Sequence, residues 1–170
     1  MNSVQIIDNF FEDPDKIVKW ANTLSYKKDI KKRWPGKRCC VCEIALHNED
    51  NNFVKKFIEK ILSIKYPNNK VNCEGIEIYF QKIEPIPGVG VIHKDDMALA
   101  GLIYLTKDAN LNSGTSIFND ASKETINISN VYNRLIMYDG NPFHRANHFH
   151  TGQNERLTLV WFIKNLYESW

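Results

Sequence analysis

Two histidines and one aspartate are the side chains of this sequence best suited to hold a metal ion. His93 and Asp95 lie two positions apart at the end of a β-rich run, so both project from one face of a strand. His144 is a third candidate, because it closely follows the β-rich run 133–138. Two imidazoles and one carboxylate on one face of a metal leave three positions open, which is the arrangement of non-haem Fe(II) oxygenases. Taken alone, the first pair equally describes a surface histidine beside an aspartate in a turn.

A guanidinium and a hydroxyl are spaced to bind a carboxylate. Arg156 begins the last β-rich run, and Thr158 follows two positions later on the same face. Arginine binds carboxylates through two parallel hydrogen bonds, so this pair can anchor the far end of an oxoacid that chelates a metal. The alternative is an arginine at a strand end that pairs with Glu155 or with solvent.

Five motifs follow one another in order along the second half of the chain. They are His93-Lys-Asp95, Ala100-Gly-Leu-Ile-Tyr104-Leu-Thr, Gly114-Thr-Ser, Asn133-Arg-Leu-Ile-Met-Tyr138 with His144 after it, and Arg156-Leu-Thr158-Leu-Val-Trp-Phe162. This ordered series resembles the 2-oxoglutarate and Fe(II)-dependent dioxygenases, and it is most similar to their prolyl 4-hydroxylase-like branch. The resemblance covers residues 79–163.

The resemblance implies a role for each matching residue and a reaction. The implied roles are Fe(II) ligation by His93, Asp95 and His144, pairing of Arg156 with the far carboxylate of 2-oxoglutarate, hydrogen bonds from Tyr104 and Thr158 to that end, and a polar contact from Tyr79 or Gln81. The implied reaction uses O₂ to hydroxylate a substrate with release of succinate and CO₂, with ascorbate as an accessory reductant. Demethylation follows from the same step if the attacked carbon is bound to nitrogen.

The second histidine ligand is ambiguous by spacing. Arg156 lies twelve residues after His144 and eight after His148, and the usual family spacing falls between the two. We prefer His144 because it closely follows the run 134–138, and we keep His148 as the alternative. Otherwise His148 and His150 are polar loop residues near the mouth of the site.

Two amphipathic helices are predicted before the motifs. Asp13 and Pro14 suit a helix start, and a helix follows to about residue 25. A second helical pattern covers about 51–66 and ends at Pro67. Their apolar residues recur at helical spacing, as Ile17, Trp20, Ala21 and Leu24 in the first helix and as Phe53, Phe57, Ile61 and Ile64 in the second.

Short β-rich runs follow, and they predict an antiparallel sandwich or barrel. The runs are 75–83, 90–93, 100–106, 115–118, 133–138 and 156–163. In the last run both alternating faces are apolar, so we expect one to line the sandwich and the other to be covered by the helices. The expected fold is mainly β (α+β), a double-stranded β-helix (jelly roll) with both helices on the outer face of the larger sheet. Gly114 is expected to turn the chain tightly at a positive φ.

Composition predicts one domain over 1–170, with 1–70 as a helical buttress and 71–170 as the jelly-roll core. The 170 residues are 43% hydrophobic, which suffices for a real core. The net charge of +2 gives no global field for nucleic acid or membranes. The longest apolar runs fall short of the roughly 20 residues that cross a bilayer, and no leader pattern opens the chain. We therefore expect a cytoplasmic protein without membrane contact.

A basic run at 27–38 surrounds Trp34 and Pro35. Such a run suits phosphate and base contacts, although a solvated loop is the more common explanation. It favours a substrate that is anionic or a polypeptide, and it leaves nucleic acid open. Neither the substrate nor the oligomeric state can be read from the sequence.

Three crowded cysteines, Cys39, Cys40 and Cys42, are too close in sequence to pair readily with one another. They lack the paired spacing of structural zinc sites, and only Cys73 offers a distant fourth thiol. Reduced thiols are expected.

Two other functions remain open. A jelly-roll module could use the same histidines and aspartate for a structural or regulatory metal, but it has no use for a carboxylate clamp such as Arg156 and Thr158. A cupin-like isomerase is a third hypothesis, and that class would be expected to carry another histidine close to His93, where Lys94 and Asp96 stand instead.

Overall fold

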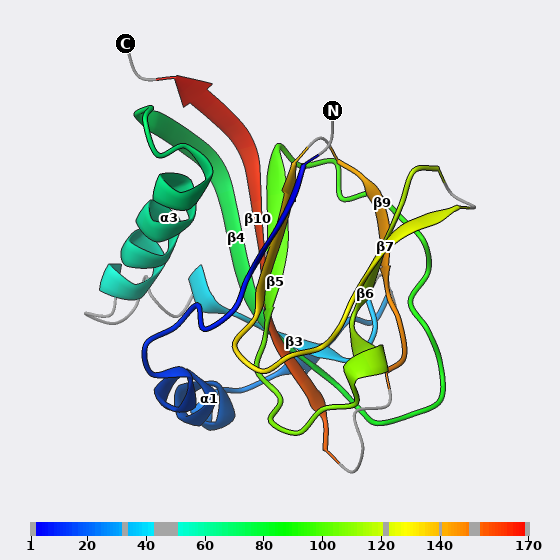
Figure 1. The fold of residues 1–170 in the computed structure, drawn as a ribbon. Helices are drawn as coiled ribbons and strands as arrows, with labels where there is room; N and C mark the ends of the chain where they lie inside the picture. The colour runs from blue at the N-terminus through cyan, green and yellow to red at the C-terminus, as the bar shows by residue number, and fades with distance from the viewer. Residues whose placement is uncertain are drawn as a thin grey trace.

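Two antiparallel sheets form a sandwich, and two helices cover the outer face of the larger one (Figure 1). The structure is a computed structural model, and it describes residues 3–31, 34–42, 51–120, 123–139, 141–149 and 154–168. The larger sheet has seven strands in the order β1-β8-β5-β10-β4-β3-β2, and the smaller has three in the order β7-β6-β9. This is the jelly roll that the sequence predicted.

The elements have the following bounds. The strands are β1 (Val4–Ile7), β2 (Lys27–Lys28), β3 (Lys37–Cys40), β4 (Val71–Ile83), β5 (Leu99–Tyr104), β6 (Thr115–Phe118), β7 (Glu124–Ile128), β8 (Leu135–Asp139), β9 (Phe143–Ala146) and β10 (Arg156–Glu168). The helices are α1 (Pro14–Thr23) and α3 (Asn51–Lys65), with a short 3₁₀ turn at Leu111–Ser113.

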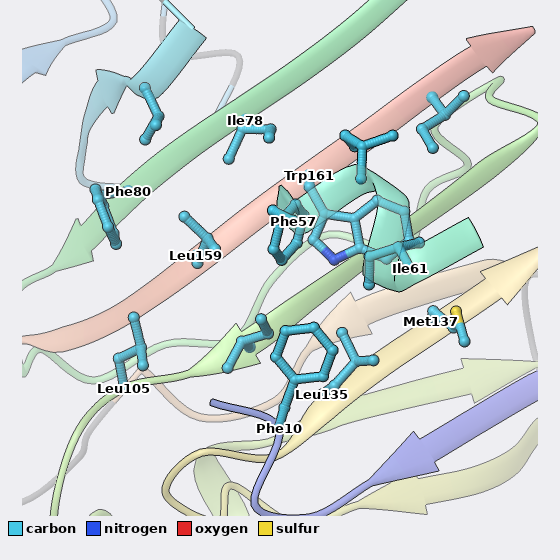
Figure 2. Close-up of a cluster of buried hydrophobic side chains, with 14 of the residues drawn as sticks. Phe10, Phe57, Ile61, Ile78, Phe80, Leu105, Leu135, Met137, Leu159 and Trp161 are labelled. Atoms are coloured by element: carbon cyan, nitrogen blue, oxygen red, sulfur yellow. The ribbon is translucent and has the colours of Figure 1, made fainter. Parts of the chain in front are cut away.

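Strand β10 separates the two hydrophobic clusters of the molecule, as its alternation predicted. Leu159 and Trp161 are fully buried on the helix side, together with Phe57 and Ile61 of α3 (Figure 2). The rings of Phe57 and Trp161 meet edge to face at 6.0 Å between centroids. Phe162 belongs instead to the cluster between the two sheets. One strand therefore holds the helices on one face and lines the interior of the sandwich on the other.

The first 70 residues do more than support the sheet. Strand β1 pairs with β8 at one edge, and β3 pairs with β4 and β2 at the other. Strands β2 and β3 were hidden in the sequence because they consist of lysine, arginine and cysteine, whereas strand prediction depends on β-branched and aromatic runs. The division of the chain into one domain with these boundaries stays a prediction.

Three further details differ from expectation. Strands β7 and β9 were not predicted, and the run 90–93 forms no strand: its His93 makes one isolated bridge, and Val89 just before it makes another. Gly114 has a φ of −84°, so the predicted positive φ is wrong. Glycine is required there for space, because a Cβ would overlap the carbonyl oxygen of Ile128.

The start of α1 is as predicted, with Asp13 accepting a hydrogen bond from Lys16 N–H at 3.0 Å.

Within the described residues no helix is long and apolar enough to cross a membrane. All four cysteines fall in this part of the chain, and none of them is in a disulfide.

Candidate metal site and cavity

The backbone places His93 and His144 directly opposite each other. Each residue donates its N–H to the carbonyl of the other at 3.0 Å, which makes an isolated antiparallel bridge. Directly opposed residues in such a pair project their side chains from the same face. The two imidazole centroids are 4.4 Å apart as a result.

Asp95 completes a group of three potential metal ligands. Its Oδ1 lies 3.4 Å from His93 Nε2, and its Oδ2 lies 3.2 Å from His144 Nε2. The ligand atoms of the three residues all lie within 4.8 Å of one another. Adjacent ligands of an octahedral cation with bonds of about 2.1 Å stand about 3.0 Å apart. The observed spacing therefore fits one small cation after minor adjustment.

The histidine side chains are oriented by backbone carbonyls two residues upstream. His93 Nδ1 lies 2.8 Å from the carbonyl oxygen of Val91, and His144 Nδ1 lies 3.0 Å from that of Pro142. A carbonyl can only accept, so each Nδ1 must carry a proton, and Nε2 is the nitrogen that faces Asp95 and is left to bind a metal. Outer hydrogen bonds of this kind fix the tautomer of metal-binding histidines.

The aspartate is held in a tight loop and in an electropositive setting. Asn141 Oδ1 accepts hydrogen bonds from the N–H groups of Asp95 and Asp96, at 3.0 and 2.9 Å. Burial raises the pKa of Asp95, but hydrogen bonds to His144 and His93 outweigh it, so the pKa is held well below its usual range. The Asp95 hydrogen bond in turn raises the pKa of His93. The carboxylate is thus ionised, as a metal ligand must be.

Tyr138 is a fourth polar group at this point, and the sequence analysis did not single it out as a site residue. Its hydroxyl lies 3.1 Å from Asp95 Oδ2 and 3.0 Å from His144 Nε2. Burial is the main reason that its pKa is raised well above the usual value, so it remains a neutral phenol. The only sequence signal was its inward alternation with Ile136 in β8.

A cavity of about 940 Å³ connects this group of three to Arg156. Arg156 is 2% exposed, its Nε donates to the carbonyl of Ser113 at 3.1 Å, and its Cζ lies 5.5 Å from the centre of the Tyr104 ring. Burial lowers the pKa of the Arg156 guanidinium, which reflects the cost of a charge in this position. The Tyr104 hydroxyl shares a hydrogen bond of 2.8 Å with Thr115 Oγ1.

Two buried polar atoms near the start of β10, one of them on the cavity-lining Arg156, lack partners among the described residues. They are Arg156 Nη2 and Thr158 Oγ1. A buried donor without a partner costs about 1–3 kcal/mol, so a ligand that satisfied both would gain that energy. An ionised carboxylate accepts from a guanidinium and a hydroxyl at once. The residues present therefore fit the far carboxylate of a 2-oxoacid.

The other predicted ligand-binding residues are placed less directly. Gln81 lines the cavity, but its Nε2 donates to the carbonyl of Pro35 at 2.7 Å. The Tyr79 hydroxyl donates to Glu77 Oε2 at 2.8 Å, in an exposed position. A role for Gln81 and Tyr79 in ligand binding stays a prediction, because their hydrogen bonds go to other groups of the protein.

The two candidate histidines of the second half of the chain occupy different positions. His144 is buried and within the group of three, whereas His148 is exposed and outside it. His150 lies outside the described residues. The predicted placement of His144 just after a strand is corrected, because it lies within β9 and pairs there with Ile117 of β6.

The chain is similar in structure to solved prolyl 4-hydroxylases. The chain superposes on a prolyl-4-hydroxylase from Pseudomonas putida with a TM-score of 0.65 and 13% identity, over 97% of this chain and 94% of the other. The fold is that of the prolyl 4-hydroxylases. A prolyl 4-hydroxylase from Phytophthora capsici gives a TM-score of 0.65 at 12% identity, over 95% of this chain and 58% of that one.

A third structure with the prolyl 4-hydroxylase fold carries a peptide. It is a prolyl hydroxylase from Trichoplax adhaerens in complex with a fragment of the hypoxia inducible factor oxygen degradation domain, with a TM-score of 0.62 and 14% identity, over 95% of this chain and 83% of that one. No family model and no curated protein sequence matches the chain. At these identities the likeness establishes the fold, and the chemistry must be argued from the site.

Proposed function

We propose that this protein is an Fe(II)- and 2-oxoglutarate-dependent oxygenase. One observation carries the proposal: the group His93, Asp95 and His144 shares a cavity with Arg156, whose buried Nη2 has no partner in the described part of the chain. A structural metal site would need the first feature and not the second. A jelly roll that binds a metal alone would gain nothing from a buried cation beside it.

Six residues have defined tasks in this proposal, of which His93, Asp95, His144 and Arg156 line the cavity and Tyr104 and Thr158 are buried behind them. His93, Asp95 and His144 would hold the metal on one face. Arg156 and Thr158 would bind the far carboxylate of 2-oxoglutarate, with Tyr104 packed under the guanidinium. When bound, Fe(II) with 2-oxoglutarate and O₂ supplies the oxidation of a substrate C–H bond, with succinate and CO₂ as coproducts and ascorbate as an accessory reductant.

The protein's own contribution is orientation and exclusion of water. Val160 and Phe162 of β10 and Leu102 of β5 line the cavity from the larger sheet. These apolar walls strengthen the electrostatic interactions of Arg156 and Asp95 and keep the substrate in one position. Because the Trichoplax neighbour was solved with a peptide, a polypeptide is the first substrate class to test. Hydroxylation is the default outcome of the reaction.

Succinate formation tests the proposal without a known substrate. The native chain, supplied with Fe(II), 2-oxoglutarate, ascorbate and O₂, is expected to form succinate slowly by uncoupled turnover. Arg156→Ala should lose this activity and still bind Mn(II), because the metal ligands are intact. The exposed His148→Ala serves as the matched control and should behave as the native chain. Metal binding without succinate formation in the native chain would favour the binding module instead.

A further inference from the structure

A second arginine, Arg38, stands in the wall of the same cavity. It lies on β3 opposite Gln81 of β4, which in turn lies opposite Thr158 of β10. These cross-strand partners share the inner face of the larger sheet. The cavity lining includes both Arg38 and Asp95, and the two charges act on each other across it. The basic run that the sequence favoured as a solvated loop therefore contributes part of a cavity wall.

The charge of Arg38 is not neutralised by an ion pair among the described residues. Its Nη2 donates a long hydrogen bond of 3.4 Å to Gln81 Oε1, and its buried Nε has no partner there. Two lysines of the same basic run are paired: Lys28 with Glu84 at 3.5 Å, and Lys37 with Glu155 at 2.7 Å.

Aromatic rings hold the Arg38 guanidinium in place. Its Cζ lies 4.6 Å from the centre of the Trp34 ring and 5.3 Å from that of Tyr79. Contacts with ring faces orient the planar group and leave its in-plane N–H donors available to a ligand. Burial is the main effect on the pKa of Arg38 and lowers it. Arg38 is half-buried, and a charge in that position is stabilised when an anion pairs with it.

The carboxylate of Asp95 does not fill this role. Its two oxygens are engaged by His93, His144 and Tyr138, and by the metal in the proposed function. In the proposed function the far carboxylate of 2-oxoglutarate pairs with Arg156. The guanidinium of Arg156 is held by the carbonyl of Ser113 and not by Arg38 or its neighbours. Arg38 and Thr158 stand on strands two apart, about 10 Å between backbones. Arg38 is therefore left without an ion-pair partner among the groups described so far.

We infer that Arg38 binds an oxyanion of the substrate, a carboxylate or a phosphate, close to the C–H bond that is oxidised. The inference rests on the proposed function for the identity of the neighbouring ligands. It makes Arg38 a specificity-determining residue, and it narrows the substrate to an acidic small molecule or an acidic or phosphorylated position of a polypeptide.

Paramagnetic relaxation by bound Mn(II) tests this inference without turnover. The native chain is loaded with Mn(II) and saturated with 2-oxoglutarate, and the relaxation of acetate methyl protons is compared with that of neutral acetamide. Acetate is expected to bind about tenfold more tightly than acetamide near the metal. A parallel arm with inorganic phosphate, observed by ³¹P, identifies which oxyanion is preferred.

Arg38→Met should reduce acetate and phosphate relaxation to the level of acetamide, and Arg38→Lys should retain part of it. Arg134→Met is the control, because Arg134 pairs with Asp8 at the surface, with 2.6 Å between Nε and Oδ1. If Arg38→Met binds both anions as the native chain does, the inference is overturned. The relaxation of the 2-oxoglutarate methylene protons, and its loss in Arg156→Met, reports separately on the proposed function. Melting temperatures show that each variant is folded.

Discussion

His93 and His144 are a directly opposed backbone pair, joined by two N–H to carbonyl hydrogen bonds of 3.0 Å. The spacing of the two imidazoles is therefore set by main-chain geometry, before any side-chain contact or metal contributes. Such preorganisation lowers the cost of assembling a metal site, because fewer rotatable bonds must be fixed on binding.

Substitution of His144, but not of His148, is expected to weaken metal binding. His144→Ala should weaken Mn(II) binding by at least about 100-fold, since removing a ligand costs more than removing an outer hydrogen bond. His148→Ala should bind Mn(II) as the native chain does, because that side chain is exposed and apart from the group. Isothermal titration calorimetry measures both. A reversed order would move the second ligand to His148.

The Tyr138 hydroxyl is expected to support the metal ligands from outside. It donates to Asp95 Oδ2 at 3.1 Å and remains neutral, so Tyr138→Phe should remove a hydrogen bond that orients the carboxylate. The Mn(II) affinity should fall about tenfold, with the melting temperature of the metal-loaded protein lowered in parallel. An unchanged Mn(II) affinity would mean that the Tyr138 hydroxyl does not support metal binding, and it would contradict this prediction.

Thr158→Val should separate ligand binding from stability. The hydroxyl of Thr158 is fully buried and has no partner among the described residues, so its removal should leave the free energy of unfolding unchanged or raise it. The dissociation constant of 2-oxoglutarate from the Mn(II) protein should rise about tenfold. Calorimetry with and without 2-oxoglutarate gives both quantities. A large loss of stability without a change in binding would contradict this role.

Gly114→Ala should destabilise the chain through a steric clash. An added Cβ would overlap the carbonyl oxygen of Ile128, and the expected loss in the free energy of unfolding is about 2–3 kcal/mol. Asparagine tolerates a positive φ better than alanine does, but the φ of Gly114 is −84°, so this property gives no advantage here. Gly114→Asn should therefore destabilise the chain at least as much as Gly114→Ala. Urea unfolding decides: if asparagine is tolerated better than alanine, backbone conformation is the cause and not space.

The ion pair between Lys65 and Asp139 predicts a pH-dependent stability. Burial raises the pKa of Asp139, but hydrogen bonds from Lys65 and Ser3 outweigh it, so its pKa is lowered in the folded state. A lowered folded pKa gives stability that is complete above the unfolded pKa of about 3.9 and is lost as the pH falls through the folded value.

The variant Asp139→Asn should therefore lose about 1 kcal/mol of unfolding free energy at neutral pH. The loss should shrink as the pH falls below about 4. Asp108→Asn is the matched control, because that exposed residue sits in a turn. Urea unfolding at several pH values measures the difference, and a difference independent of pH would rule out this ion pair as its source.

The sequence predicted the parts of the molecule that follow simple periodicity. Alternation in 156–163 predicted that one face lines the sandwich and the other is covered by helices, because β-strands have a strict period of two, and the structure places Trp161 on the helix side and Phe162 between the sheets. The metal group could be predicted because the order of its motifs is restrictive. His144 was placed outside a strand because the four residues Phe143–Ala146 are too short and too polar to stand out.

Tyr138 and Arg38 illustrate what the sequence could not supply. Their importance arises from contacts across strands that are far apart in the chain, such as Arg38 of β3 beside Gln81 of β4. Local pattern reports which face a residue occupies and not what stands opposite. The contacts of both residues could be seen only once register and pairing were known.

The two faces of strand β10 together fix its pairing register. Arg156 and Thr158 share this strand with Leu159 and Trp161, which belong to the opposite layer, and β10 is paired with β4 over twelve positions and with β5 over six. Slippage by one residue would send the guanidinium under the helices and the indole into the ligand space. Every such shifted conformer is penalised on both faces of the strand, so the packing of Leu159 and Trp161 against the helices also fixes Arg156 in the wall of the cavity.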